Sequence, residues 1–196
     1  MITETRTNLA WPLVAVGPLA IAVLRLVMPY DTTDDAATIA AKAAAHPDTQ
    51  SLVVWLGFVA MLTMAPAVLW VARATHGAAP RLTTTAVALL APAYLSLGLL
   101  VAGDAAAWSG VRVPEHPAII AGGVVFVVGH VAGTVLLGVA MWFSPAVPRW
   151  AAVLTMAAQP LHFVAAVVIT SHPLDFVAWG LNAIGFAAAV RWRHER

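Results

Sequence analysis

The feature that most constrains this chain is a succession of long apolar segments separated by short polar ones. A helix needs about 20 predominantly apolar residues to cross the hydrocarbon core of a bilayer. Such segments must be helical, because a lipid-exposed strand would leave backbone groups without hydrogen bonds. Six segments meet this length or approach it: residues 9–28, 51–72, 83–103, 118–143, 150–170 and 176–190. We therefore predict an all-α membrane protein, with residues 1–196 forming one six-transmembrane-helix bundle.

The composition agrees with this prediction and excludes several classes of function. Hydrophobic residues make up 61% of the chain and charged residues only 10%, whereas soluble domains carry about 25% charged residues. The net charge is +1 and no basic stripe is present, so a nucleic-acid partner is not expected. The chain has no cysteine, which excludes disulfides, thiolate catalysis and cysteine-based metal sites.

The short connecting segments carry a charge asymmetry that predicts the orientation. With the N-terminus inside, the inner segments hold seven basic residues and the outer segments hold two, Lys42 and Arg112. Cytoplasmic loops are enriched in Lys and Arg, so both termini are predicted to be cytoplasmic. The inner basic residues are Arg6, Arg73, Arg81, Arg149, Arg191, Arg193 and Arg196.

Tryptophan placement gives an independent indication of the span ends. Indole rings favour the membrane–water interface, where the ring is in an apolar layer and the N–H can find a partner. Two tryptophans, Trp108 and Trp179, are predicted near the outer interface. Five are predicted at the inner one: Trp11, Trp70, Trp142, Trp150 and Trp192.

The longest connection, residues 29–50, contains its own helix signal. Residues 34–45 (DDAATIAAKAAA) begin with acids, which favour a helix N-terminus, and end before His46-Pro47. This pattern predicts a short amphipathic extracytoplasmic helix between spans one and two. Its apolar face is mostly alanine, so we expect it to lie against the outer ends of the bundle.

The first half of the chain also carries a resemblance. The first span ends at Pro29, an alanine-rich segment closes on AAAHPDT, and a short loop bracketed by arginines, RATHGAAPR, follows the second span. This layout resembles six-span integral membrane proteins of uncharacterised function from actinobacteria and other bacteria. The resemblance implies a multi-pass protein of the bacterial cytoplasmic membrane and carries over no functional residue.

Polar side chains at membrane depth define the candidate site. Ionisable residues inside spans are costly, so each needs a partner or a function. His130 and His162 both lie about twelve residues into neighbouring antiparallel spans, near the bilayer midplane. Gly129-xxx-Gly133, beside His130, is a spacing that lets helices approach closely. Four further polar residues lie at comparable depth and are predicted to join the same cluster: Tyr94, Thr155, Gln159 and Asn182.

Three interpretations of this cluster remain open. It can be a satisfied polar core that only fixes helix packing. It can be a cavity that binds a lipid-like molecule or moves a proton, since the histidine pKa lies near neutrality. It can also be a site at which His130 and His162 ligate haem or a metal ion.

Two other groups of ionisable residues invite interpretation. Arg25 and Asp104 lie toward the outer ends of spans one and three, and are predicted to form either a structural ion pair or an anion-attracting site. Three outer histidines are each followed by proline, which favours helix boundaries over a zinc site, so no metal site is predicted there. These are His46, His116 and His172.

Together these features predict a membrane protein that binds or acts on a small hydrophobic or lipid-like ligand in a polar intramembrane cavity. The first alternative is a non-catalytic subunit whose polar core is structural and whose glycine faces bind a partner membrane helix. An oligomeric transporter or a bis-histidine haem protein is a further alternative. The expected partners are membrane lipid, a hydrophobic small molecule, and a second copy or a partner helix.

Overall fold

The computed structural model describes residues 10–111 and 116–192, and this part of the chain is helical with no strand. Arg6, Arg112, Arg193 and Arg196, which contribute to the predicted charge asymmetry, lie outside the described residues, as does the side chain of Trp192. The elements are α1 (Ala10–Val27), α2 (Ala36–Ala45), α3 (Pro47–Thr75), α4 (Pro80–Trp108), α5 (Pro117–Phe143), α6 (Arg149–Phe163), the π-helical η1 (Val164–Ile169) and α7 (His172–Trp192).

Five of these helices are long and apolar enough to cross a membrane. They are α3, α4, α5, α6 continued by η1, and α7, as far as Arg191. Helix α1 is also apolar but shorter, with 18 residues. The chain therefore has the helices of a multi-pass membrane protein.

The helix starts follow from local sequence. Pro47, Pro80 and Pro117 begin α3, α4 and α5, where the missing proline N–H leaves no helical bond unmade. The Asp35 side chain caps α2 by accepting a hydrogen bond from the backbone N–H of Thr38 at 2.7 Å. The helix predicted in the first connection is therefore present.

The three His-Pro pairs lie at helix starts, as predicted. His46 ends α2 and precedes α3, His116 precedes α5, and His172 begins α7. The imidazole of His116 accepts a hydrogen bond from the Ala118 backbone N–H at 3.2 Å. Among the described residues, no group of three or more His, Asp or Glu side chains could hold a metal ion.

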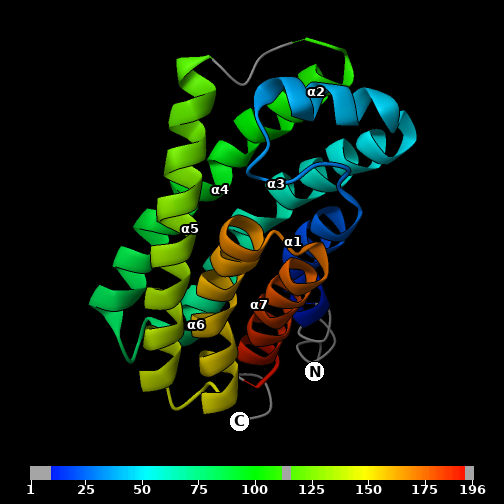
Figure 1. Cartoon of the computed structure of the whole chain (residues 1–196). Coiled ribbons are helices and arrows are strands. Elements are labelled where there is room, and N and C mark those ends of the chain that lie inside the picture. Colours follow the sequence, from blue (N-terminus) through cyan, green and yellow to red (C-terminus); the bar gives the residue numbers. More distant parts are fainter. Residues whose placement is uncertain (1–9, 112–115, 193–196) are drawn as a thin grey trace, which may run out of the picture.

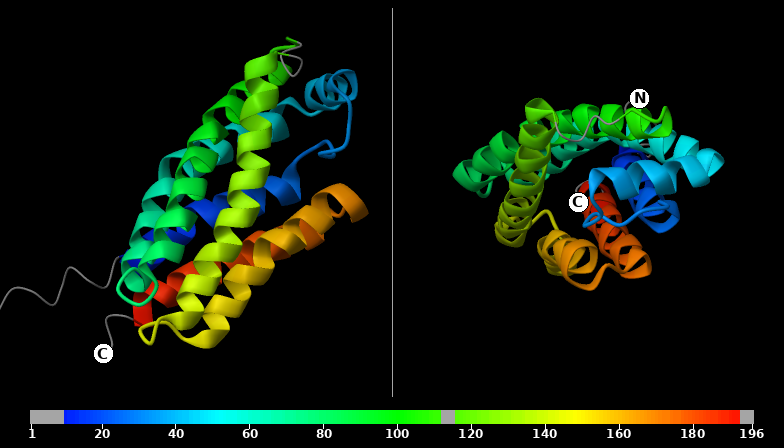
Figure 2. Two further views of the ribbon diagram at one scale, coloured as in Figure 1. Left: turned by 90° about the vertical axis from the view of Figure 1, so that its left-hand side faces the viewer. Right: turned by 45° about the horizontal axis from the view of Figure 1, so that its top comes forward.

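The six long helices form a closed ring. Going round it, α1 packs on α3, α3 on α4, α4 on α5, α5 on α6, α6 on α7, and α7 on α1 (Figures 1 and 2). Helix α2 lies across one end of the ring, against α3 and α4. This arrangement leaves the interior of the ring available for a cavity at the end covered by α2.

Glycines allow α4 and α5 to approach closely. A Cβ atom on Gly129 would lie 2.7 Å from the carbonyl oxygen of Leu89, and one on Gly133 would lie 2.6 Å from Cγ of Leu90. Both distances are far below van der Waals contact, so larger residues would push the helices apart. The Gly129-xxx-Gly133 face is thus used inside the ring.

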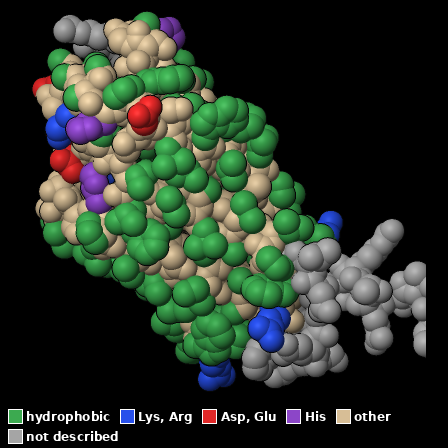
Figure 3. Space-filling model, turned by 90° about the vertical axis from the view of Figure 1, so that its right-hand side faces the viewer, with side chains coloured by type: hydrophobic (Ala, Val, Ile, Leu, Met, Phe, Trp, Pro, Cys, Tyr) green, Lys and Arg blue, Asp and Glu red, His purple; other side chains and the backbone are tan. Residues whose placement is uncertain are grey.

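Charges separate to the two ends of the molecule. The described chain ends, the α3–α4 turn and the α5–α6 turn lie together at one end, with Arg side chains (Figures 1 and 3). The one lysine, Lys42, lies on α2 beside Asp34. Acidic and histidine side chains gather at the other end, and hydrophobic side chains cover the surface between them (Figure 3). At the basic end, guanidinium groups lie over indole rings in three pairs: Arg73 on Trp70, Arg149 on Trp142 and Arg191 on Trp11.

One interfacial tryptophan was predicted wrongly. Trp108 is exposed, whereas Trp179 is fully buried in the ring. The reason is that α7 begins at His172, so Trp179 already lies two turns inside the helix, on a face that contains Asp175. This burial places an indole ring beside His130 and His162.

Candidate functional site

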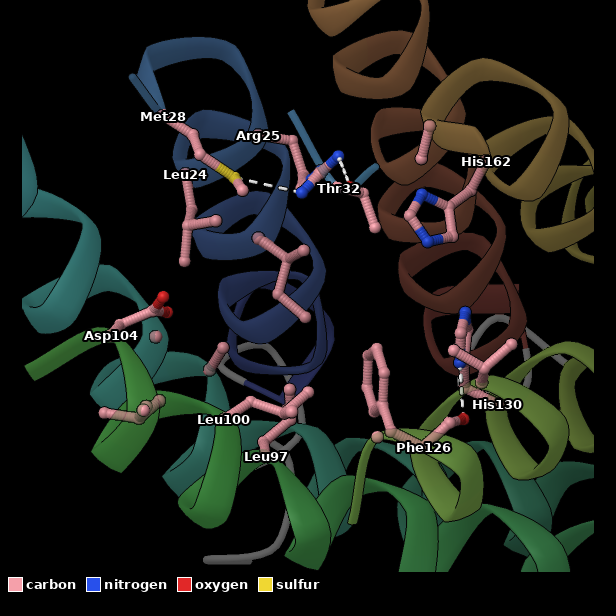
Figure 4. Close-up of a pocket in the computed structure, with 18 of the residues that line it drawn as sticks. Leu24, Arg25, Met28, Thr32, Leu97, Leu100, Asp104, Phe126, His130 and His162 are labelled. Carbon is pink, nitrogen blue, oxygen red and sulfur yellow. Dashed lines mark hydrogen bonds between the residues drawn. The ribbon is translucent and has the colours of Figure 1, made fainter. Parts of the chain in front are cut away.

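A cavity of about 370 Å³ lies inside the ring (Figure 4). All six long helices, η1, α2 and the segment after α1 contribute to its wall, and most lining residues are apolar. Ile39 of α2 lines the end that α2 covers, and His130, His162 and Trp179 are the innermost lining residues of α5, α6 and α7. The volume falls within the roughly 300–1,000 Å³ of small-molecule sites.

Asp175 does not itself line the cavity, but its fully buried carboxylate contacts two residues that do, Arg25 and His162. Its Oδ2 accepts a hydrogen bond from Nε of Arg25, and its Oδ1 lies 2.5 Å from Nδ1 of His162. Arg25 also donates from Nη2 to the Thr32 hydroxyl at 2.6 Å and from Nη1 to Sδ of Met28 at 2.9 Å. The guanidinium is therefore neutralised and its three nitrogens are all engaged.

The predicted ion pair between Arg25 and Asp104 is not formed. Arg25 is on α1, which packs directly against α7 and its Asp175, whereas α3 separates α1 from α4 and Asp104 in the ring. Asp104 instead accepts a hydrogen bond from the Tyr30 hydroxyl. Figure 4 shows Asp104 across the cavity from His130 and His162.

Tyr30 and Gln50 join the elements at the end of the cavity that α2 covers. Burial and the neighbouring Asp104 carboxylate raise the pKa of the Tyr30 phenol, so this group stays protonated and donates. Gln50 donates from Nε2 to the backbone oxygen of Asp104 at 3.1 Å. These bonds connect the segment after α1, the start of α3 and the end of α4.

The two histidines predicted at one depth lie side by side, and each Nδ1 contacts an acceptor oxygen. Nδ1 of His130 lies 2.6 Å from the backbone oxygen of Phe126. A carbonyl oxygen only accepts, so Nδ1 carries the proton and Nε2 presents a lone pair. Nδ1 of His162 likewise donates to the Asp175 carboxylate, which leaves its Nε2 outside that bond. The ring centroids are 5.3 Å apart, and Figure 4 shows both rings at the same end of the cavity.

Aromatic rings fix the orientation of both imidazoles. Phe126 and Trp179 stack on His130, with centroids 4.2 Å and 5.8 Å away. The Trp179 indole nitrogen lies 3.1 Å from Nδ1 of His162, but this Nδ1 donates to Asp175, so the indole contact is one of packing. Axial haem ligation needs a porphyrin between the two imidazoles, and rings packed this closely leave no such gap.

The remaining predicted cluster residues are buried but do not line the cavity. Gln159 and Asn182 lie one turn below the innermost lining residues of α6 and α7, and Thr155 lies one turn further along α6. Tyr94 is on α4, with its hydroxyl next to Thr134 of α5. Within the described part of the chain, the amide atoms of Gln159 and Asn182 and the Thr155 hydroxyl have no hydrogen-bond partner. The predicted single cluster is therefore two: the cavity histidines and a deeper polar layer.

Sequence reasoning missed Asp175, Trp179, Tyr30 and Thr32. Asp175 stands one residue before the predicted start of the last span, so the sequence places it in a connecting segment and not in a helix. A signal was nevertheless present, since Asp175 and Trp179 are four residues apart and therefore share a helix face. An acid on the face of a buried indole indicates a buried partner for that acid.

No protein-family model, curated protein or solved structure matches this chain.

Proposed function

We propose that this chain is a six-span protein of the bacterial cytoplasmic membrane, with both termini cytoplasmic, that binds a small hydrophobic or lipid-like ligand inside its helix ring. One observation carries the proposal: a largely apolar cavity ends at two imidazoles that are each held through Nδ1. Ligand sites commonly combine an apolar wall with a few polar groups that orient the ligand. The short first helix counts as the sixth span in this proposal.

The ligand enters from the lipid between α5 and η1. Val127 of α5 and Phe163 and Val167 of the α6–η1 helix line the cavity and are also exposed at the surface. Figure 2 shows α5 and the α6–η1 helix diverging from the turn that joins them. Helix η1 is a π-helix, a form that is frequent at functional sites.

The partner-subunit alternative loses its main support in this arrangement. It relied on glycine faces being available to another membrane helix. Gly129 and Gly133 instead pack on α4 of the same chain. The deeper layer of Gln159 and Asn182 fits a structural role, but it does not account for the cavity above it.

The test of binding is native mass spectrometry on protein purified in mild detergent, with and without a side chain that fills the cavity. Gly123 lines the cavity, and a Cβ atom there would meet only Leu100, at 3.9 Å, so Gly123→Phe extends into open space. The matched control is Gly180→Phe on α7, which does not line the cavity. We expect a lipid-like molecule at a fixed ratio on the wild type and control, and its loss from Gly123→Phe. Equal retention by all three proteins would contradict the proposal.

The orientation can be tested separately because the chain has no cysteine. Ala41 on α2 and Gly77 in the α3–α4 turn are both exposed. A membrane-impermeant maleimide added to intact cells is expected to label Ala41→Cys and to leave Gly77→Cys unlabelled until the cells are lysed. The reverse pattern would place the termini outside.

A further inference from the structure

We propose that the cavity selects an uncharged amphiphile whose head group donates hydrogen bonds, such as a lipid-like diol, over one with an anionic head group. This inference rests on the proposed binding function and adds the chemical class of the ligand. It follows from which polar atoms of the wall remain available to a ligand.

In this proposal both imidazoles are neutral, so the polar atoms that remain available are acceptors. Nδ1 of His130 is committed to the Phe126 carbonyl and Nδ1 of His162 to the Asp175 carboxylate. Nε2 of His130 is buried without a partner among the described residues, and His130 itself is 1% exposed. An unpaired buried acceptor is costly, so a ligand that donates a hydrogen bond to it gains affinity.

The cationic atoms, in contrast, are already used. All three nitrogens of Arg25 have partners, and the Asp175 carboxylate cancels its charge. A second anion in this apolar wall would have to compete with Asp175 for the guanidinium. Arg25 therefore does not make the cavity an anion site, which was one of the roles predicted for it.

The placement of the imidazoles favours a head group with two donors. His130 and His162 have ring centroids 5.3 Å apart at the same end of the cavity. A single hydroxyl can donate to only one Nε2 at a time, whereas two adjacent hydroxyls can satisfy both. The apolar remainder of the cavity then receives the alkyl chain.

The experiment compares three probes of equal chain length: 1,2-dodecanediol, its dimethyl ether and dodecanoate. The full-length protein is placed in lipid nanodiscs containing each probe at the same mole fraction, and occupancy is read by native mass spectrometry. One net hydrogen bond contributes about 0.5–1.5 kcal/mol, or roughly three- to tenfold in affinity. We expect the diol to bind at least tenfold more tightly than the ether, and more tightly than dodecanoate.

A variant locates the preference. His130→Phe removes one acceptor. The Phe126 carbonyl that loses the imidazole lies in the middle of helix α5, so it still accepts its backbone hydrogen bond within the helix. The preference for diol over ether is expected to fall to roughly threefold, and an exposed control, His76→Phe, is expected to keep the wild-type preference. Monodisperse size-exclusion profiles and unchanged melting temperatures establish that the variants fold.

The outcomes separate the two proposals. Equal binding of diol and ether, or tighter binding of dodecanoate, would overturn the donor preference while leaving a hydrophobic site in place. Binding of no probe would overturn the proposed function itself. As an independent check, ¹⁵N spectra of the imidazoles are expected to show neutral rings protonated at Nδ1 for His130 and His162. Protonation at Nε2 would refute the assignment of both acceptors.

Discussion

The substitution Asp175→Asn tests the buried ion pair that holds Arg25 in the cavity wall. It removes the charge that neutralises Arg25, whose side chain is only 10% exposed, while Asp175 itself is fully buried. An exposed ion pair contributes about 0–1 kcal/mol, but removing one member of a buried pair costs about 3–5 kcal/mol because the other charge is left uncompensated. The asparagine oxygen can still accept from Arg25 or His162, but its amide group faces whichever donor remains.

We therefore expect Asp175→Asn to lower the free energy of unfolding by about 3–5 kcal/mol. For a chain of this length that corresponds to a fall in melting temperature of about 6–20 °C, measured by thermal unfolding in mild detergent. Arg25→Met combined with Asp175→Asn removes both charges, and this double variant should recover most of the loss. A cost below about 1 kcal/mol for Asp175→Asn, or additive losses in the double variant, would refute the buried ion pair.

Three further predictions concern other parts of the ring. Gly129→Ala should destabilise the protein by about 1–3 kcal/mol, because its Cβ would lie 2.7 Å from a backbone oxygen. Gly123→Ala in the same helix should be nearly neutral, and thermal unfolding compares the two variants. Gln159→Met should leave the melting temperature unchanged or raise it, since it removes two buried amide atoms without partners among the described residues, and a clear fall would reveal a partner for that amide. The cap bond from Thr38 lowers the pKa of Asp35. The stabilisation of α2 by this bond is therefore present above the ordinary carboxyl pKa and is lost as the pH falls through the lowered pKa of Asp35. Amide exchange in α2, corrected for intrinsic rates, should rise between about pH 5 and about pH 2 in the wild type and not in Asp35→Ala.

The helices could be predicted because each depends on local sequence. Long apolar segments, prolines at N-terminal positions and the acids before residue 36 are all visible in the chain. The charge asymmetry is visible in the same way, and arginines gather at the end of the ring that holds the α3–α4 and α5–α6 turns (Figures 1 and 3). Neither signal predicts which helices are neighbours, and the order of the helices around the ring is known only from the structure.

The candidate site was predictable only where two neighbouring helices are joined by a short turn. Antiparallel α5 and α6 bring His130 and His162 to one depth, so their meeting could be predicted from residue counts alone. The partner of Arg25 could not be predicted in this way. Asp175 is 150 residues away in sequence, and only the contact between the first and last helices makes it a neighbour.

The buried ion pair bears on the choice between a structural core and a binding site. A core that only fixed packing would be at least as stable with apolar side chains in place of Arg25 and Asp175. The pair instead holds His162: the carboxylate fixes the proton on Nδ1, and Arg25 fixes the carboxylate from α1 while Thr32 fixes the guanidinium. Its effect is to hold Nδ1 of His162 and leave Nε2 outside that bond, as the Phe126 carbonyl does for His130. Helices α5 and α6 thus each present an imidazole held through Nδ1 to one cavity. A packing role does not require this arrangement, whereas the proposed ligand with two donors does.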